Sequence, residues 1–282
     1  MNNRRSCENL SWQNVELEVI MSMEQLQTDG VSGPYDLADK SLVDDVIELA
    51  IEFKSNQRQR NIELKAAGEQ LYHRALIDRH PEFCAMKNLF LDENVRAVAT
   101  ECFGSDLVIC GSVFQLKYRG VGENKWHHDR AFEDGDRPVD LHDNGNHFTV
   151  LFALTDFGMN QGRIEYVQGA HLPIDGFDRS QRFMMELPAE VHDRVQPLTM
   201  KKGQFAVFYS SLMHRSLAFA HDEKTWSPNY FGKPSTSNSE GIDYSDNSDN
   251  GGRISLAIRL MRNGTVIPDS YTHPENSIFA FN

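Results

Sequence analysis

The stretch Arg253-Ile-Ser-Leu-Ala-Ile-Arg259-Leu-Met261 alternates regularly between two kinds of side chain. The two arginines, Ser255 and Ala257 fall on one face of an extended chain, and isoleucine and leucine fall on the other, because successive strand residues point to opposite sides. The pattern predicts a β-strand whose apolar face packs against a core. Its other face turns two guanidinium groups into the protein, where an unpaired charge is costly.

Other short apolar runs precede this strand, and glycines separate them. The runs are Leu107–Leu116, Phe148–Leu154, Ile164–Val167 and Gln204–Tyr209, and the glycines are Gly162, Gly169, Gly203 and Gly252. β-rich runs bounded by turn residues are typical of short strands. We therefore predict an α+β protein built around a double-stranded β-helix, the cupin-like jelly roll of two facing sheets.

The first hundred residues have a helical pattern. Ser41 is a candidate N-cap for a helix whose apolar stripe runs from Leu42 to Phe53. A second helix is expected over Asp92–Phe103, with Asp92 as its cap and Gly104 as its C-terminal stop. We expect these helices to pack on the major sheet of the jelly roll.

The length of 282 residues fits a single domain spanning 1–282. We divide it into a mainly helical part (1–105), a jelly-roll core (106–262) and a C-terminal tail (263–282). The stretch His221–Gly252 is polar, acidic and too long for an ordinary connection between strands. It is either a disordered insertion or a lid that orders over a substrate.

Charge and cysteine usage limit the partners and the compartment. Acidic residues outnumber basic ones by 41 to 28, and a net charge of −13 disfavours binding to nucleic acid. The chain has no run of about 20 apolar residues and no signal-peptide pattern at its start. Its four cysteines lack CxxC spacing, as expected of reduced thiols. We expect a cytoplasmic protein, not bound to a membrane, of unknown oligomeric state.

The strongest local motif is Lys125-Trp126-His127-His128-Asp129. In an extended segment His127 and Asp129 point the same way and can meet one ion, whereas His128 points elsewhere. Two imidazoles and a carboxylate on one face of an octahedron are typical of non-haem Fe(II) oxygenases. His214, just after the run that ends at Tyr209, is the best candidate for the second imidazole. Taken alone, the triplet also fits a surface histidine bonded to a carboxylate.

The arginine-bearing face of the 253–261 strand has two interpretations. Arg253 suits a dicarboxylate co-substrate, because the planar guanidinium binds a carboxylate through two hydrogen bonds. The competing interpretation is a structural pair between arginine and aspartate on a sheet that faces solvent.

The order of four sequence blocks resembles the phytanoyl-CoA dioxygenase superfamily. The blocks are His127-x-Asp129, Asn160-Gln-Gly-Arg-Ile-Glu-Tyr-Val-Gln-Gly-Ala-His171, Gly203-Gln-Phe-Ala-Val-Phe-Tyr-Ser-Ser-Leu-Met-His214 and the Arg253 strand. In that superfamily the second block usually reads NGxLxxxPGSH, and the third reads GDxxxF and closes on the distal iron histidine. This chain departs from the pattern at Gln168 to His171 and in the stretched distance from His214 to Arg253.

Within the superfamily, the resemblance is closest to the non-haem iron chlorinating enzymes of natural-product biosynthesis. It rests on Asp29-Gly-Val-Ser-Gly-Pro-Tyr35, Met200-Lys-Lys-Gly-Gln-Phe205 and Ser211-Leu-Met-His214, and it covers residues 27 to 262. Those enzymes have a small residue at the position of Asp129, and the vacancy admits chloride to the iron. The carboxylate of Asp129 therefore disfavours direct halogenation and favours oxygen insertion.

The resemblance implies Fe(II), 2-oxoglutarate and O₂ as cofactors and co-substrates, with His127, Asp129 and His214 as metal ligands. It implies that Arg253 binds the distal carboxylate of 2-oxoglutarate and that Arg259 binds its other end or the substrate. It also places Asn124 and Thr149 beside the co-substrate.

The implied activity is hydroxylation of an unactivated C–H bond in a small metabolite, with release of succinate and CO₂. The chlorinating branch suggests an amino acid or natural-product intermediate, free or tethered to a carrier protein. Two alternatives remain at this point. One is a cupin-like metal-dependent isomerase or hydrolase without 2-oxoglutarate, and the other is a non-catalytic binding protein on the same fold.

Overall fold

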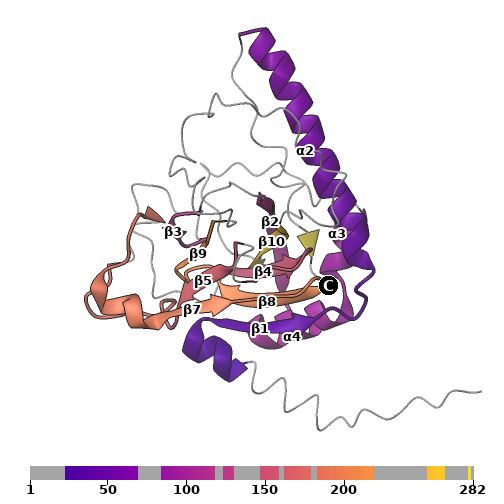
Figure 1. The fold of residues 1–282 in the computed structure, drawn as a ribbon. Coiled ribbons are helices and arrows are strands. Elements are labelled where there is room, and N and C mark those ends of the chain that lie inside the picture. Colours follow the sequence, from indigo (N-terminus) through magenta and orange to yellow (C-terminus); the bar gives the residue numbers. More distant parts are fainter. Residues whose placement is uncertain are drawn as a thin grey trace, which may run out of the picture.

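The computed structural model describes residues 23–68, 84–117, 123–129, 147–158, 162–178, 183–218, 253–263 and 279–280 (Figure 1). The helices are α2 (Leu42–Ala66), α3 (Cys84–Phe90), α4 (Glu93–Phe103) and the 3₁₀ helix η1 (Ala189–Arg194), and residues 23–29 are also helical. The strands are β1 (Val31–Asp36), β2 (Leu107–Lys117), β3 (Trp126–His127), β4 (His147–Ala153), β5 (Ile164–Val167), β6 (Phe183–Met184), β7 (Val195–Leu198), β8 (Gln204–Tyr209), β9 (His214–Ser216), β10 (Arg253–Arg262) and β11 (Phe279–Ala280).

The described strands form two antiparallel sheets. The major sheet has the order β1-β8-β4-β10-β2-β11, and the minor sheet has the order β6-β3-β9-β5-β7. One apolar cluster joins the facing sides of the two sheets and includes Leu151, Phe208 and Ala257 from the major sheet with Ile164 and Tyr166 from the minor sheet. This arrangement confirms the predicted α+β fold with a double-stranded β-helix core.

The helices cover the outer face of the major sheet. Figure 1 shows α2, α3 and α4 gathered beside this sheet. Val46 of α2 and Val95 of α4 belong to one buried cluster with Ile254, Leu256 and Ile258 of β10. The alternation in the sequence therefore means that the two faces of β10 pack in two different cores. The apolar side chains of β10 meet the helices, and the side that carries Ser255 and Ala257 faces the barrel.

β1 is an element that the sequence pattern did not predict. It lies within the part expected to be mainly helical, and it pairs with β8 at the edge of the major sheet. Gly33 and Pro34 interrupt its alternation, and the register shifts between Ser32 and Tyr35. Proline is tolerated in an edge strand because one side of the strand needs no partner. A strand interrupted in this way lacks regular alternation, so the sequence pattern does not reveal it.

Both predicted helices are present, but only one of the predicted caps binds its helix. The Asp92 carboxylate accepts hydrogen bonds from the backbone N–H groups of Asn94 and Val95, and Gly104 follows the helix with a φ of 91°. Ser41 lies just before α2, and its hydroxyl donates to Asp39.

Asp92 also joins two segments that are far apart in the sequence. The same buried carboxylate accepts from the backbone N–H groups of Ala38 and Asp39, at 3.2 and 3.0 Å. Replacing Asp92 with alanine removes a helix cap and leaves two further N–H groups without this acceptor. We expect the free energy of unfolding in urea to fall by about 3 kcal/mol. Asp92→Asn keeps one acceptor oxygen and should lose less than half of that amount; equal losses would contradict the role of the carboxylate.

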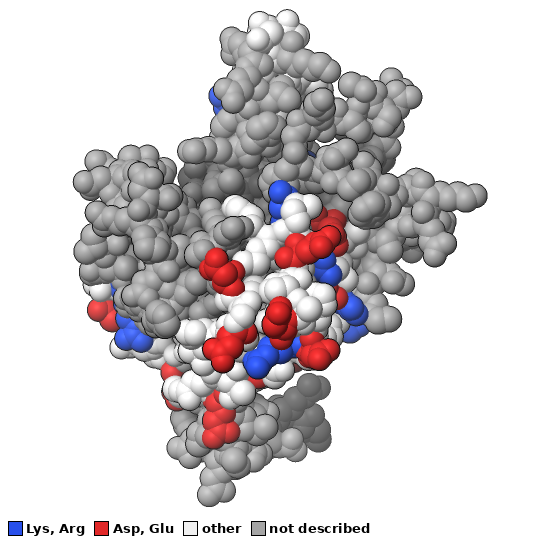
Figure 2. Space-filling view, turned by 90° about the vertical axis from the view of Figure 1, so that its left-hand side faces the viewer, with Lys and Arg blue, Asp and Glu red and all other residues white. Residues whose placement is uncertain are grey.

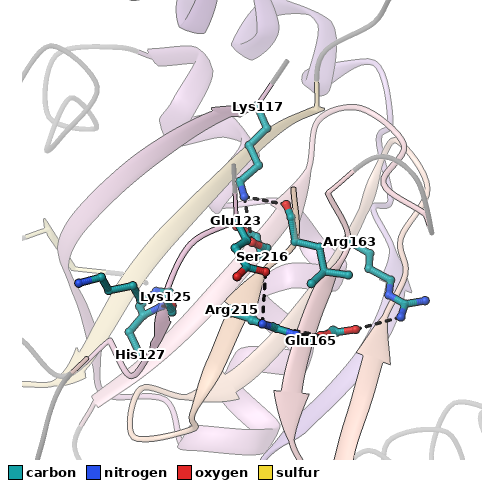
Figure 3. Close-up of polar contacts among 9 residues, drawn as sticks. Lys117, Glu123, Lys125, His127, Arg163, Glu165, Arg215 and Ser216 are labelled. Carbon is teal, nitrogen blue, oxygen red and sulfur yellow. Dashed lines mark hydrogen bonds and ion pairs between the residues drawn. The ribbon is translucent and has the colours of Figure 1, made fainter. Parts of the chain in front are cut away.

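The surface over the minor sheet carries mixed charge. Figure 2 views the side on which Figure 1 shows β3 and β7, and acidic and basic side chains lie next to one another over its described part. Arg163 and Arg215 both pair with Glu165 at 2.9 Å, and Arg215 also meets Glu123 at 3.3 Å. Arg163, Glu165, Arg215 and Glu123 thus form one connected series of ion pairs on the minor sheet (Figure 3).

Several expectations fall outside the described part of the chain. These are the nature of the insertion His221–Gly252, Cys7 and most of the tail after residue 263. The division into a single domain therefore stays a prediction. Among the described residues, Cys84, Cys102 and Cys110 form no disulfide, and no helix there is long and apolar enough to cross a membrane.

Candidate metal centre

The two candidate histidines lie directly opposite each other in the minor sheet. His127 ends β3, His214 begins β9, and the two are Cα partners in the antiparallel ladder. Side chains of directly paired residues point to the same face of a sheet. The two imidazole rings accordingly approach to 4.3 Å between centroids. Pairing between strands, and not the chain sequence, brings together residues that are 87 positions apart (214 minus 127).

Backbone carbonyls orient both rings. Nδ1 of His127 lies 2.8 Å from the carbonyl oxygen of Lys125, and Nδ1 of His214 lies 3.0 Å from that of Leu212. A carbonyl accepts but cannot donate, so each Nδ1 carries a proton, and in the neutral ring Nε2 has the lone pair that can bind a metal. Hydrogen bonds of this kind fix the tautomer of metal-binding histidines. Figure 3 shows His127 beside Lys125, to whose backbone carbonyl the His127 Nδ1–H donates.

Asp129 completes the group from the segment that follows β3. Its backbone N–H donates to the carbonyl of Ser210 at 2.7 Å. Its carboxylate accepts from the Thr149 hydroxyl at Oδ2 and from the Arg259 guanidinium at Oδ1, at 3.0 and 3.2 Å. Burial raises the pKa of this carboxyl, but Arg259, the two histidines and Thr149 outweigh burial and hold the pKa well below its usual range. The group is therefore an ionised carboxylate at neutral pH.

The three ligand atoms lie within 4.8 Å of one another, and no other such cluster of metal-binding side chains occurs among the described residues. Two neutral imidazole nitrogens and one carboxylate oxygen fit a divalent iron ion. Such a set occupies one face of an octahedron and leaves three positions open. His128, which extended geometry turns away from the ion, is fully buried and does not belong to the cluster.

A recess runs from the three residues into the barrel. Besides His127, Asp129 and His214, it is lined by Gln115, Asn124 and Ser216, with apolar walls from Leu151, Ile164, Phe208 and Ala257. Its volume is about 310 Å³, part of which is open to solvent. Polar and apolar side chains therefore line the recess together, which suits a small molecule that carries polar groups.

Arg253 lies next to the Gln115 end of this recess. Its guanidinium donates to the side chains of Gln115 and Ser255 and to the carbonyl of Gly162, and it is fully buried. No carboxylate among the described residues pairs with it. Gly162 has a φ of 68°, and a Cβ there would lie 3.1 Å from the carbonyl oxygen of Leu217, so the backbone can approach this closely only at a glycine.

Lys117 places a second cation beside Arg253. The two residues are Cα partners in the ladder of β2 and β10. The Lys117 ammonium donates to the carbonyls of Ser216 and Leu217 at 2.9 and 2.7 Å (Figure 3). Burial, together with the charge of Arg253, lowers the pKa of Lys117 to about 7. The burial of Lys117 depends on contacts between distant strands, which give no signal in the sequence.

Four residues were predicted to contact the co-substrate, and the structure separates them into two groups. Asn124 lines the recess and Arg253 adjoins its far end. Thr149 and Arg259 both donate to Asp129. Contact of these four residues with the co-substrate therefore stays a prediction.

Aromatic residues flank the two histidines in the same row of the minor sheet. Phe183 is the Cα partner of His127, and Tyr166 is the Cα partner of His214. The Phe183 ring stacks on His127 at 6.0 Å and is 48 % exposed. Sequence analysis missed both residues, because their position follows from strand register alone.

The family model for phytanoyl-CoA dioxygenase (PhyH) matches residues 28–220, which is more than half of the chain. The chain belongs to this family. The family comprises Fe(II)- and 2-oxoglutarate-dependent oxygenases, so its cofactor is Fe(II) and its co-substrates are 2-oxoglutarate and O₂. This membership confirms the predicted superfamily, whereas the position close to the chlorinating branch stays a prediction.

Solved structures share the fold at low sequence identity. The carbocyclase SnoK from nogalamycin biosynthesis is 14 % identical, with 93 % of this chain and 87 % of that chain covered and a TM-score of 0.56. The epimerase SnoN, solved with Fe³⁺, alpha ketoglutarate and nogalamycin RO, is 18 % identical, with 88 % and 84 % covered and a TM-score of 0.55. The non-heme monooxygenase ThoJ, as a nickel complex, is 16 % identical, with 85 % and 76 % covered and a TM-score of 0.54. Comparison with curated protein sequences gives no significant match.

Proposed function

We propose that this PhyH-family oxygenase hydroxylates an unactivated C–H bond of a small metabolite, with His127, Asp129 and His214 as the iron ligands. The observation that carries the proposal is the convergence of these three side chains, which come from three segments, beside a recess that leads to a buried arginine. In the balanced reaction, R–H, O₂ and 2-oxoglutarate give R–OH, succinate and CO₂. The iron supplies the oxidising chemistry when bound, and the protein positions the reactants and excludes water.

Arg253 is proposed to bind the distal carboxylate of 2-oxoglutarate. A fully buried guanidinium whose hydrogen bonds run to neutral oxygens retains an uncompensated charge, which a dianionic ligand would balance. Lys117 adds to this positive end of the recess whenever it is protonated. Asn124 and Ser216 line the walls between the iron ligands and this end.

Asp129 favours oxygen insertion over halogenation. A carboxylate in the third ligand position leaves no vacancy there for chloride. The two hydrogen bonds from Thr149 and Arg259 hold this carboxylate in place. Hydroxylation is therefore the outcome that we propose, and solved structures that share the fold also include an epimerase and a carbocyclase.

The substrate is proposed to be an amino acid or natural-product intermediate, free or tethered to a carrier protein. Phe183 supports an apolar group in the substrate, because its half-exposed ring stands against the ligand His127. A substrate that presents its C–H bond to the metal from this side would contact the Phe183 ring. The dependence of the family on 2-oxoglutarate argues against the alternative of a cupin-like isomerase or hydrolase.

Anaerobic titration tests the metal chemistry. Fe(II) and 2-oxoglutarate added together should produce a weak visible charge-transfer band, and neither should produce it alone. A screen of amino acids and natural-product intermediates should then identify compounds that stimulate succinate formation, with the iron-free protein as a silent control. Stimulated succinate without a hydroxylated product would refute hydroxylation. A titration without any band would refute the proposed co-substrate site.

The lowered pKa of Lys117 predicts a pH dependence of 2-oxoglutarate binding. Below pH 7 Lys117 is charged and attracts the dianion, and as pH rises through about 7 it loses its proton and that attraction. The dissociation constant of 2-oxoglutarate, measured by calorimetry on the Mn(II)-saturated protein, should rise severalfold between pH 6 and pH 8.5. Lys117→Met should bind weakly at both values. A pH dependence that persists in this variant would assign the effect to another group.

A further inference from the structure

The ligand Asp129 lies between two donors that differ in charge. Thr149 donates to Oδ2 through an uncharged hydroxyl, and Arg259 donates to Oδ1 through a guanidinium. The two donors are Cα partners on β4 and β10, so they project side by side from the inner face of the major sheet. The carboxylate of Asp129, from the segment that follows β3, is thus held by two neighbouring residues of the major sheet.

The pair between Arg259 and Asp129 is largely shielded from water. The side chains of Arg259 and Asp129 are 16 % and 8 % exposed, and their closest atoms are 3.2 Å apart. Charges in such surroundings act on each other, and on a nearby ion, more strongly than they would in water. The Arg259 charge is therefore felt at the position where His127, Asp129 and His214 converge.

We infer that Arg259 is a positioning residue that sets the balance between metal affinity and co-substrate affinity. Its positive charge opposes the binding of a divalent cation to Asp129 and favours the arrival of a dianion at the same centre. Thr149 contributes orientation without charge. This inference deepens the proposed function and rests on the proposed iron and 2-oxoglutarate sites.

Removal of the guanidinium should leave the carboxylate in place. The Thr149 hydroxyl still holds Oδ2, and the backbone N–H of Asp129 still donates to Ser210. In a variant without the guanidinium, the lost charge should therefore change the affinities more than the lost hydrogen bond to Asp129 does. The expected signature is two dissociation constants that move in opposite directions, which a merely structural defect does not produce.

The test measures the affinity for Mn(II) by calorimetry, then the affinity of the Mn(II)-saturated protein for 2-oxoglutarate. In Arg259→Gln we expect the dissociation constant for Mn(II) to fall about tenfold and that for 2-oxoglutarate to rise about tenfold. Arg259→Lys keeps the charge and should retain both constants within a factor of about three. Thr149→Val removes the uncharged donor and should not tighten Mn(II).

The outcomes separate this inference from the proposed function. If the wild-type protein bound neither Mn(II) nor 2-oxoglutarate, the proposed centre itself would be wrong. If the wild-type protein bound both, but Arg259→Gln weakened both or changed neither, the electrostatic role of Arg259 would be overturned. Tighter Mn(II) in Thr149→Val would overturn it as well, because an uncharged donor would then have the same effect.

Discussion

His214→Ala is expected to abolish tight iron binding and to reduce 2-oxoglutarate-dependent turnover at least a thousandfold. The change removes one of the three metal ligands, and the described residues offer no fourth ligand in this cluster that could replace it. Loss of a metal ligand removes the reacting centre, not one contact among many. Metal content after dialysis against Fe(II), together with succinate formation, measures the effect.

A second histidine provides the matched control. His192 is exposed in η1, where its Nε2 lies 3.0 Å from the carbonyl oxygen of Leu187, outside the metal cluster. His192→Ala should retain full metal content and turnover. Comparable losses in the two variants would indicate a general effect of histidine removal and would contradict the assignment of His214.

Arg253→Gln is expected to weaken 2-oxoglutarate binding about a hundredfold while the affinity for Mn(II) stays within a factor of about three. A charge-assisted hydrogen bond contributes about 1.5–3 kcal/mol, and the guanidinium offers two of them to a carboxylate. Glutamine keeps an amide that can donate to Gly162 or Ser255, but it lacks the positive charge and the two parallel N–H donors of the guanidinium. Calorimetry on the metal-saturated protein measures the dissociation constant.

The length of the co-substrate offers a control for Arg253. Pyruvate retains the α-keto acid but lacks the distal carboxylate, so its weak binding should be the same in Arg253→Gln and in the wild-type protein. Arg253→Lys, with its point charge, should recover only part of the affinity for 2-oxoglutarate. A hundredfold loss that also appeared with pyruvate would place Arg253 outside the carboxylate site and assign it to the scaffold.

The fold was largely predictable because its strands carry local signals. Ile164–Val167 and Gln204–Tyr209 match β5 and β8 in full, and the alternation of the 253–261 stretch identified both the strand and its two faces. Asp92 and Gly104 marked the ends of α4 for similar reasons of local hydrogen bonding. Where a local signal was absent, as in the edge strand β1 with its Gly33 and Pro34, the strand was not predicted.

The metal motif was predictable from spacing, but its surroundings were not. His127 and Asp129 share a short segment, so their common direction follows from extended geometry. The contacts of Arg259 with Asp129 and of Lys117 with Ser216 depend on register between strands that are far apart in the sequence. The same strand face can meet a co-substrate at Arg253 and a ligand carboxylate at Arg259, and periodicity alone does not distinguish the two.

The register of two short strands is therefore the structural basis of the site. A slip of one residue between β3 and β9 would turn His127 away from His214, because successive residues point to opposite faces. The carbonyls of Lys125 and Leu212, two residues before each histidine, then fix both rings in matching tautomers. The sheet and these two carbonyls thus orient both histidines in the absence of a metal ion.

Anomalous diffraction at the iron edge, from crystals grown anaerobically with Fe(II) and 2-oxoglutarate, tests the central claim most directly. The account predicts one strong peak bound by Nε2 of His127, Nε2 of His214 and the Asp129 carboxylate, with the far carboxylate of 2-oxoglutarate on Arg253. An iron peak bound elsewhere, or a ligand set that omits His214 or Asp129, would contradict it.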